Sequence, residues 1–101
     1  MRITVLTPDK ELFKGAATSV KVPGTDGQFQ ILKNHAAIVS SLGMGEIEVV
    51  TAGGEHSFYD EESSTIKTVE EPGKTISFSI ERGFIEMLNN EVSLLVRGLK
   101  E

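Results

Sequence analysis

Two histidines are the first residues of this chain to consider, because an imidazole can act as a general base or bind a metal. His35 lies in a turn-rich stretch, Val22–Ala37 (VPGTDGQFQILKNHAA). A serine hydrolase would need a serine, a histidine and an acid held together. Serines are abundant, but no nucleophile-elbow pattern surrounds any of them. Hydrolysis with His35 as the base therefore stays as a disfavoured alternative, and we expect no catalytic residues.

Metal binding is the second chemistry to weigh. The run Asp60-Glu61-Glu62 offers adjacent carboxylates, but it lacks the alternating oxygen ligands and the central glycine of a calcium loop. A solvated charge run in the polar loop Asp60–Ser64 (DEESS) explains it better. Neither His35 nor His56 has a third ligand at metal spacing, and the chain has no cysteine. We expect no metal site and no cofactor.

The glycine-rich segment Pro23–Gly27 (PGTDG) invites comparison with a phosphate-binding loop. Such a loop needs a Lys-Ser/Thr pair and the start of a helix, so that backbone N–H groups point at the phosphate. Here the glycine is followed by Gln28–Ile31 (QFQI), which is a strand pattern. The segment therefore predicts a turn between two strands and no nucleotide site.

Any functional side chains must be held by β-strands, because the dominant hydrophobic period of the chain is two. Apolar residues alternate with polar ones in several short runs, which places one face of each run in a core. The clearest runs are Ile3–Leu6, Ser19–Val22, Glu46–Val49, Thr75–Ile80 and Val92–Arg97.

Turn residues separate these runs, and no segment shows a convincing helical stripe. The Asn89-Asn90 pair stands between two apolar runs and predicts a tight hairpin, because asparagine tolerates a positive φ. The spacing predicts an all-β protein, a two-sheet β-sandwich of roughly nine or ten short, mostly antiparallel strands. We expect residues 1–101 to form a single domain.

Composition excludes several kinds of partner. The net charge is −5 and the ten basic residues are scattered, which argues against nucleic acid. The longest apolar runs are far shorter than the ~20 residues of a membrane-spanning helix. The N-terminus has no apolar signal region, so a cytosolic location is the default expectation.

The order of the segments carries more information than any one motif. In sequence they are Ile3–Leu6, Thr7-Pro8, Phe13–Gly15, Val20–Ala36, Leu42, Gly45–Ile47, Gly83–Glu86 and Asn90–Leu95. This order resembles the N-terminal β-sandwich domain of the epsilon subunit of F-type ATP synthases, which is called delta in mitochondria. The resemblance spans nearly the whole chain.

The chain departs from the family pattern at several positions. Neutral or basic residues replace a glutamate, glycines and prolines of the family, and segment 51–81 is longer than usual. The replacements are Gln28, Gln30, Lys33, Ala37, Met44 and Arg82. Most members continue into a two-helix C-terminal domain that restrains ATP hydrolysis. Only five residues follow Val96 here, and one stable helix needs ~12. We expect that domain, and inhibition by it, to be absent.

The resemblance implies a non-catalytic rotor subunit that links the gamma subunit to the polar loops of the c-ring. It would couple proton or sodium flow to ATP synthesis at the cytoplasmic face of a bacterial inner membrane, held there only through the complex. Matching positions imply c-ring contacts at Asp26, Gln28, Lys33 and His35, and gamma contacts at Thr7, Ser40 and Leu42.

We further expect the polar residues on both sides of the strand Phe29–Leu32 to form tips at one end of the sandwich. Within that strand Phe29, Ile31 and Leu32 should anchor the core. An alternative, suggested by Gln28, Gln30 and Lys33, is a free-standing β-sandwich module that binds a small ligand or peptide.

Overall fold

The computed structural model describes residues 1–54, 56–60, 65–69 and 72–98. These residues form ten β-strands and no helix, which confirms the all-β prediction. The strands are β1 (Arg2–Leu6), β2 (Glu11–Gly24), β3 (Gly27–Leu32), β4 (Ile38–Leu42), β5 (Gly45–Thr51), β6 (His56–Asp60), β7 (Thr65–Val69), β8 (Thr75–Ile80), β9 (Arg82–Leu88) and β10 (Glu91–Arg97). In this part of the chain there is no α-helix long and apolar enough to span a bilayer.

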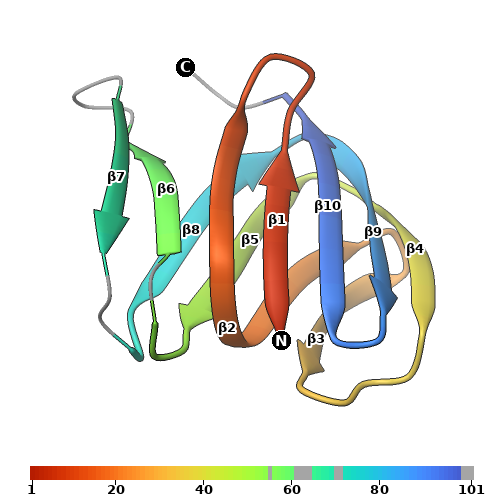
Figure 1. Ribbon diagram of the computed structural model, residues 1–101. Helices are drawn as coiled ribbons and strands as arrows, with labels where there is room; N and C mark the ends of the chain where they lie inside the picture. Colours follow the sequence, from red (N-terminus) through yellow and green to blue (C-terminus); the bar gives the residue numbers. More distant parts are fainter. Residues whose placement is uncertain (55, 61–64, 70–71, 99–101) are drawn as a thin grey trace.

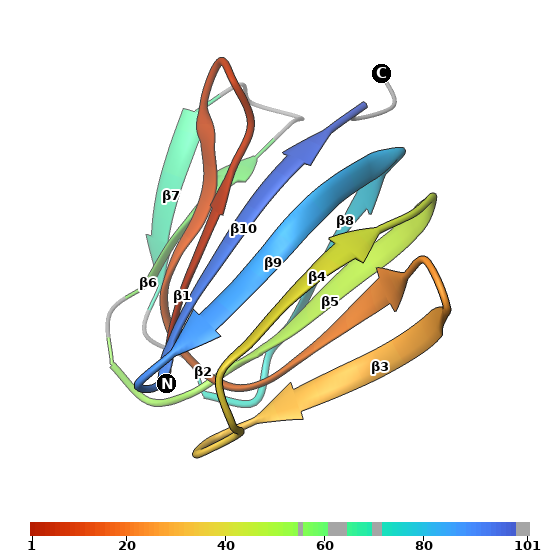
Figure 2. The same ribbon diagram turned by 90° about the vertical axis from the view of Figure 1, so that its right-hand side faces the viewer.

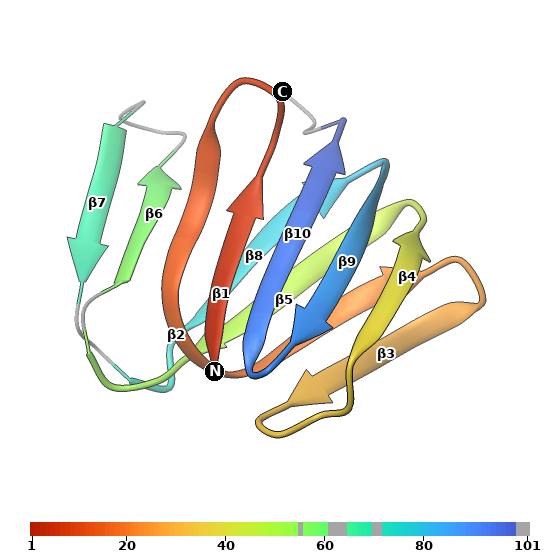
Figure 3. The same ribbon diagram turned by 45° about the vertical axis from the view of Figure 1, so that its right-hand side comes forward.

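The strands form two layers joined by one long strand (Figures 1 and 3). The ladder runs β1-β10-β9-β4-β2-β5-β8, with β3 attached to β2. The first half of β2 pairs with β1, and its second half pairs with β3 and β5. One layer therefore contains β1, β10, β9 and β4, and the other contains β3, β5 and β8. The β1–β10 pair is parallel, and the other pairs are antiparallel.

The long segment 51–81 contains a hairpin of β6 and β7 beside the sandwich (Figure 1). β6 pairs with the first half of β2 at Phe13↔Phe58 and Lys14↔Ser57. Near the turn end of the hairpin the ammonium of Lys10 lies 4.2 Å from the ring centroid of Tyr59, a cation–π distance. Of the polar loop expected at 60–64, residues 61–64 lie outside the described residues.

Alternating side chains from both layers build the core, as the period of two predicts. β8 and β10 bury every second residue, and β9 buries Ile85 and Met87 on the same alternation. Within β3, Ile31 is fully buried and Phe29 packs partly buried against the core. The prediction that Leu32 also faces the core is wrong, because its side chain is 54% exposed. Adjacent residues of a strand point to opposite faces, so Ile31 and Leu32 cannot both point inward.

The Asn89-Asn90 turn has the predicted conformation. The two asparagines have φ of 52° and 62°, and the flanking Leu88 and Glu91 are paired. Positive φ at both central residues is what a two-residue type I′ hairpin requires. This turn fixes the register of β9 against β10, so it decides which side chains meet on the surface of the first layer.

Candidate interaction surfaces

An apolar groove of about 550 Å³ lies on the outer face of the first layer, at the end where β1, β4 and β10 finish and β9 begins. Side chains and backbone from these four strands and from the loop after β1 line it. The lining residues are Leu6, Thr7, Pro8, Ser41, Leu42, Arg82, Gly83, Phe84, Leu95, Val96 and Arg97. The wall is mostly apolar although the groove is open to water, so an apolar surface remains uncovered there.

One row of the ladder forms the floor of the groove. Ser41 pairs with Phe84, Phe84 with Leu95, and Leu95 with Leu6 across four adjacent strands. Residues opposite one another in a ladder point to the same face. Phe84 and Leu95 are 58% and 53% exposed. Large apolar side chains gathered on an exposed face mark an interaction site more often than isolated ones do.

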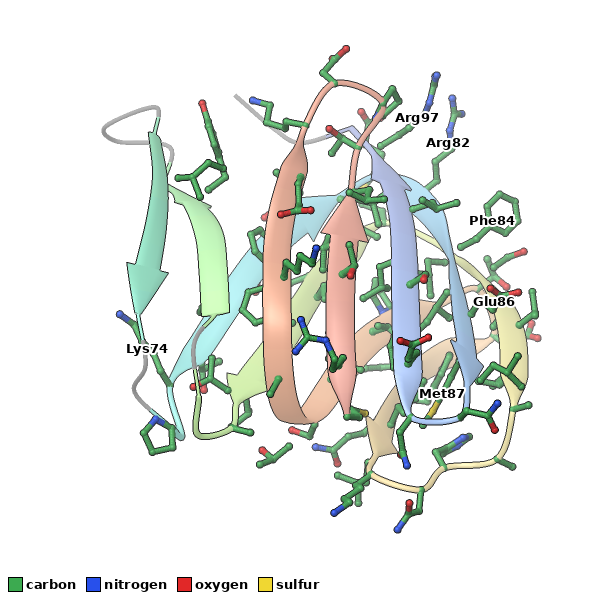
Figure 4. The ribbon with its side chains drawn as sticks, viewed as in Figure 1. Lys74, Arg82, Phe84, Glu86, Met87 and Arg97 are labelled. Atoms are coloured by element: carbon green, nitrogen blue, oxygen red, sulfur yellow. The ribbon has the colours of Figure 1, made fainter. Side chains whose placement is uncertain are left out.

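Gly83 allows β9 to lie close to β10 in the groove. A Cβ placed there would lie 2.4 Å from the carbonyl oxygen of Leu95 and 3.0 Å from the Cα of Val96, which is too close for any side chain. Next to it, Arg82 pairs with Arg97, so two guanidinium groups lie across from each other at one end of the groove. Figure 4 shows both arginines projecting from the same end of β9 and β10.

The expected gamma contacts lie at or near this groove. Thr7 lines it and organises the adjacent turn, because its Oγ1 accepts hydrogen bonds from the backbone N–H groups of Asp9 and Lys10 (3.3 and 3.1 Å). Leu42 contributes to the lining although only 2% of it is exposed. Ser40 is half-buried, and its neighbour Ser41 lines the groove instead.

The expected c-ring contacts do not form one tip, which corrects the prediction. The turn with Asp26 closes the β2–β3 hairpin where Gly24 pairs with Gly27, and Gln28 follows it. Lys33 and His35 come after Leu32, at the opposite end of β3 (Figure 2). A strand rises about 3.3 Å per residue, so the length of β3 separates the two groups by roughly 15–20 Å.

The Lys33–His35 end is held to the β9–β10 turn by paired amides. The backbone N–H of Asn34 donates to Oδ1 of Asn90 (2.7 Å), and Nδ2 of Asn90 donates to Oδ1 of Asn34 (2.9 Å). Asn34 has a φ of 66°, a conformation that asparagine tolerates. His35 is exposed, with its Nδ1 donating to the carbonyl of Ala36 at 2.7 Å.

Within the described ranges no group of three or more His, Asp or Glu side chains could hold a metal ion. His35 hydrogen-bonds through its Nδ1 to the carbonyl of Ala36 and through its backbone N–H to the carbonyl of Leu32, and neither partner is a serine. The surface does offer an uncovered apolar groove on the first layer and exposed polar residues along β3.

The two layers of strands define a small β-sandwich domain. A family model for the ATP synthase delta/epsilon chain β-sandwich domain matches residues 1–60. The chain belongs to this family, and the resemblance found in the sequence is confirmed.

Relatives support the assignment over almost the whole chain. An ATP synthase epsilon chain from Leptospira borgpetersenii is 37% identical over 94% of this chain and 59% of its own length. One from Chlorobium limicola is 34% identical over 97% of this chain and 90% of its own length. The chain thus spans about three fifths of the Leptospira relative's length.

A solved structure of similar fold comes from the Tetrahymena thermophila mitochondrial ATP synthase, described as central stalk and c-ring. Its matching chain has a TM-score of 0.62 and 16% identity, and the match covers 100% of this chain and 66% of that one. At this identity the likeness shows the shared fold.

Proposed function

We propose that the chain is a non-catalytic rotor subunit of an F-type ATP synthase, and that it links the gamma subunit to the c-ring. Its relatives are named ATP synthase epsilon chain, and the Tetrahymena chain of similar fold comes from a central stalk and c-ring assembly. In this role it helps couple proton or sodium flow to ATP synthesis. It lies at the cytoplasmic face of a bacterial inner membrane, attached only through its partners.

The exposed groove carries the gamma half of this proposal. Phe84 and Leu95 stand on hydrogen-bonded strands of a packed sheet, so the apolar surface is preformed and little ordering is needed when a partner covers it. Thr7 and Leu42, two of the three expected gamma contacts, belong to its lining. Ser40 does not line the groove, so it would contribute by positioning its neighbour Ser41, which does.

The c-ring half of the proposal uses the outer flank of β3. In the described residues β3 pairs only with β2, which leaves its other edge open. Gln28 and Gln30 are exposed along it, with Asp26 before them and Lys33 and His35 beyond. Because these residues span the strand's length, the c-ring loops contact the flank along β3 instead of a single tip.

Binding to the cognate gamma subunit tests the proposal. The purified chain should form a stable complex in calorimetry and size-exclusion chromatography. Phe84→Asp should weaken it by about 2–4 kcal/mol, the cost of losing a central apolar anchor. Leu88→Asp is the matched control, since Leu88 lies on the same strand, is 57% exposed and does not line the groove. If the folded chain does not bind gamma, the proposal is wrong.

The β3 flank has a separate test in the gamma–epsilon complex added to isolated c-rings. Gln28→Lys and His35→Ala alter opposite ends of the flank, and each should reduce the amount of complex retained on the rings. Both variants should fold normally because both side chains are exposed. If only one end matters, the lengthwise contact is wrong.

The groove also keeps a second candidate function open, a free-standing module for a small ligand or peptide. Its volume of about 550 Å³ falls in the range of small-molecule sites, and its wall is largely apolar. A ligand that raises the melting temperature of a chain without affinity for gamma would favour this function.

A further inference from the structure

The groove ends in a concentration of positive charge that the apolar floor does not explain. Arg82 on β9 and Arg97 on β10 are directly paired across the hairpin, and both are exposed. By the period of two they point to the same outer face as Phe84 and Leu95. Figure 4 shows the two side chains at one end of the sheet, beyond Phe84.

Folding alone gives no reason for this pairing. Like charges directly opposite in an antiparallel pair destabilise a sheet. The chain has only ten basic residues among 101 and a net charge of −5, so cations are scarce and could easily be kept apart. No ion pair joins either guanidinium to a carboxylate in the part of the chain that the structure describes. A carboxylate brought by a bound partner would compensate this repulsion.

We propose that the segment seated in the groove is acidic at one end, and that its carboxylate pairs with Arg82 and Arg97. This inference rests on the proposed function and names the chemistry of the gamma segment. Apolar side chains fill the floor over Phe84 and Leu95, and the carboxylate meets the arginine end. The planar guanidinium groups suit this task, because they bind carboxylates through two parallel hydrogen bonds and stay charged when partly desolvated.

The arrangement also sets a direction. A purely apolar groove would accept a segment in either orientation, whereas a groove with a cationic end strongly favours the orientation that places the acid there. Arg82 stands where the family pattern has the first of two paired glycines. The matching acid is therefore expected on this chain's own gamma subunit.

Calorimetry on the full chain and its cognate gamma subunit tests the proposal at low and high salt. Arg82→Gln and Arg97→Gln should each weaken binding about tenfold, as expected for a hydrogen bond to a charged group. The neutral variants should flatten the salt dependence, and the double variant Arg82→Glu/Arg97→Glu should weaken binding further and reverse it, because salt screens the new repulsion between like charges. Arg2→Gln is the control, since Arg2 is exposed on β1 and does not line the groove, and it should change affinity less than about twofold.

A charge exchange identifies the source of the anion. Replacing acidic residues of gamma by lysine, one at a time, should find one that restores binding to the double glutamate variant. Unchanged affinity of that variant for gamma would overturn the inference while leaving the rotor function intact. Self-association of the chain that the same substitutions abolish would also overturn it, since a second copy would then be the occupant. Failure of the unsubstituted chain to bind gamma would remove the proposed function itself.

Discussion

Replacing Gly83 by alanine should destabilise the domain strongly, although it adds only one methyl group. The new Cβ would lie 2.4 Å from the carbonyl oxygen of Leu95 and 3.0 Å from the Cα and Cγ1 of Val96. Carbon–oxygen contacts between strands normally stay at about 3.3 Å or more, so β9 and β10 would have to separate locally by about 1 Å. Both neighbours include backbone atoms of a central ladder, which cannot rotate away.

The expected cost follows from two terms. Overpacking a well-packed site costs about 1–3 kcal/mol. Stretching the adjacent ladder hydrogen bonds adds about 1 kcal/mol. We therefore expect Gly83→Ala to lower the free energy of unfolding by about 2–4 kcal/mol. For a domain of this size that corresponds to a melting temperature lower by about 10–30 °C.

Urea unfolding followed by circular dichroism measures this cost directly. The midpoint should fall and the slope should stay constant, which indicates a change of stability alone. Gly53→Ala is the matched control, because nothing lies within 4 Å of a Cβ at Gly53 and its φ is not in the left-handed region. It should be neutral or stabilising by up to about 1 kcal/mol. Equal midpoints for Gly83→Ala and the unsubstituted chain would refute the account of β9 and β10 packing.

Two further predictions concern the β3 end and its anchor. Asn90→Gly keeps the positive φ but removes the paired amides, so hydrogen exchange in the His35 loop should accelerate. Asn89→Gly should leave that exchange unchanged, because among the described residues the hydrogen bonds to the loop come from Asn90. Ile31→Ala should cost about 2–5 kcal/mol because the side chain is fully buried, whereas His35→Ala should change stability by less than about 0.5 kcal/mol. Similar losses at these two positions in thermal melts would contradict the assignment of faces.

Local patterns predicted the elements because strands and turns depend on near neighbours. The alternation in Thr75–Ile80 and the Asn89-Asn90 pair each specified their own conformation without help from distant residues. The error at Leu32 came from assigning Phe29, Ile31 and Leu32 to the core together, although Ile31 and Leu32 are adjacent in the strand. Strand geometry admits only alternate members, and Ile31 took the inner position.

The single polar tip failed for a different reason. Asp26 and His35 are near in sequence, and a loop would have kept them near in space. β3 lies between them, and an extended strand carries its ends further apart than any other structure of equal length. The family motif therefore indicated which residues match the expected c-ring contacts, but it did not indicate on which side of the molecule each residue lies.

The groove could be predicted only in part, because it depends on register between strands far apart in sequence. Nothing local indicates that Leu6 and Ser41 flank the same row as Phe84 and Leu95. The arginine pair was within reach of sequence reasoning. Once the two-residue turn at Asn89-Asn90 is accepted, counting back along both strands brings Arg82 opposite Arg97.

The strand order explains how a small domain could carry load between two partners. The groove lies on the first layer and the polar flank lies on β3, which belongs to the second layer. β2 pairs with strands of both layers, and backbone hydrogen bonds from Thr25 to Ser41 (3.2 Å) and from Gly43 to Pro23 (2.8 Å) tie its end to β4. A force applied at the groove therefore reaches β3 through consecutive hydrogen-bonded backbones and a close-packed core, both of which resist deformation. Stiffness along this path is the mechanical property that the proposed rotor role demands.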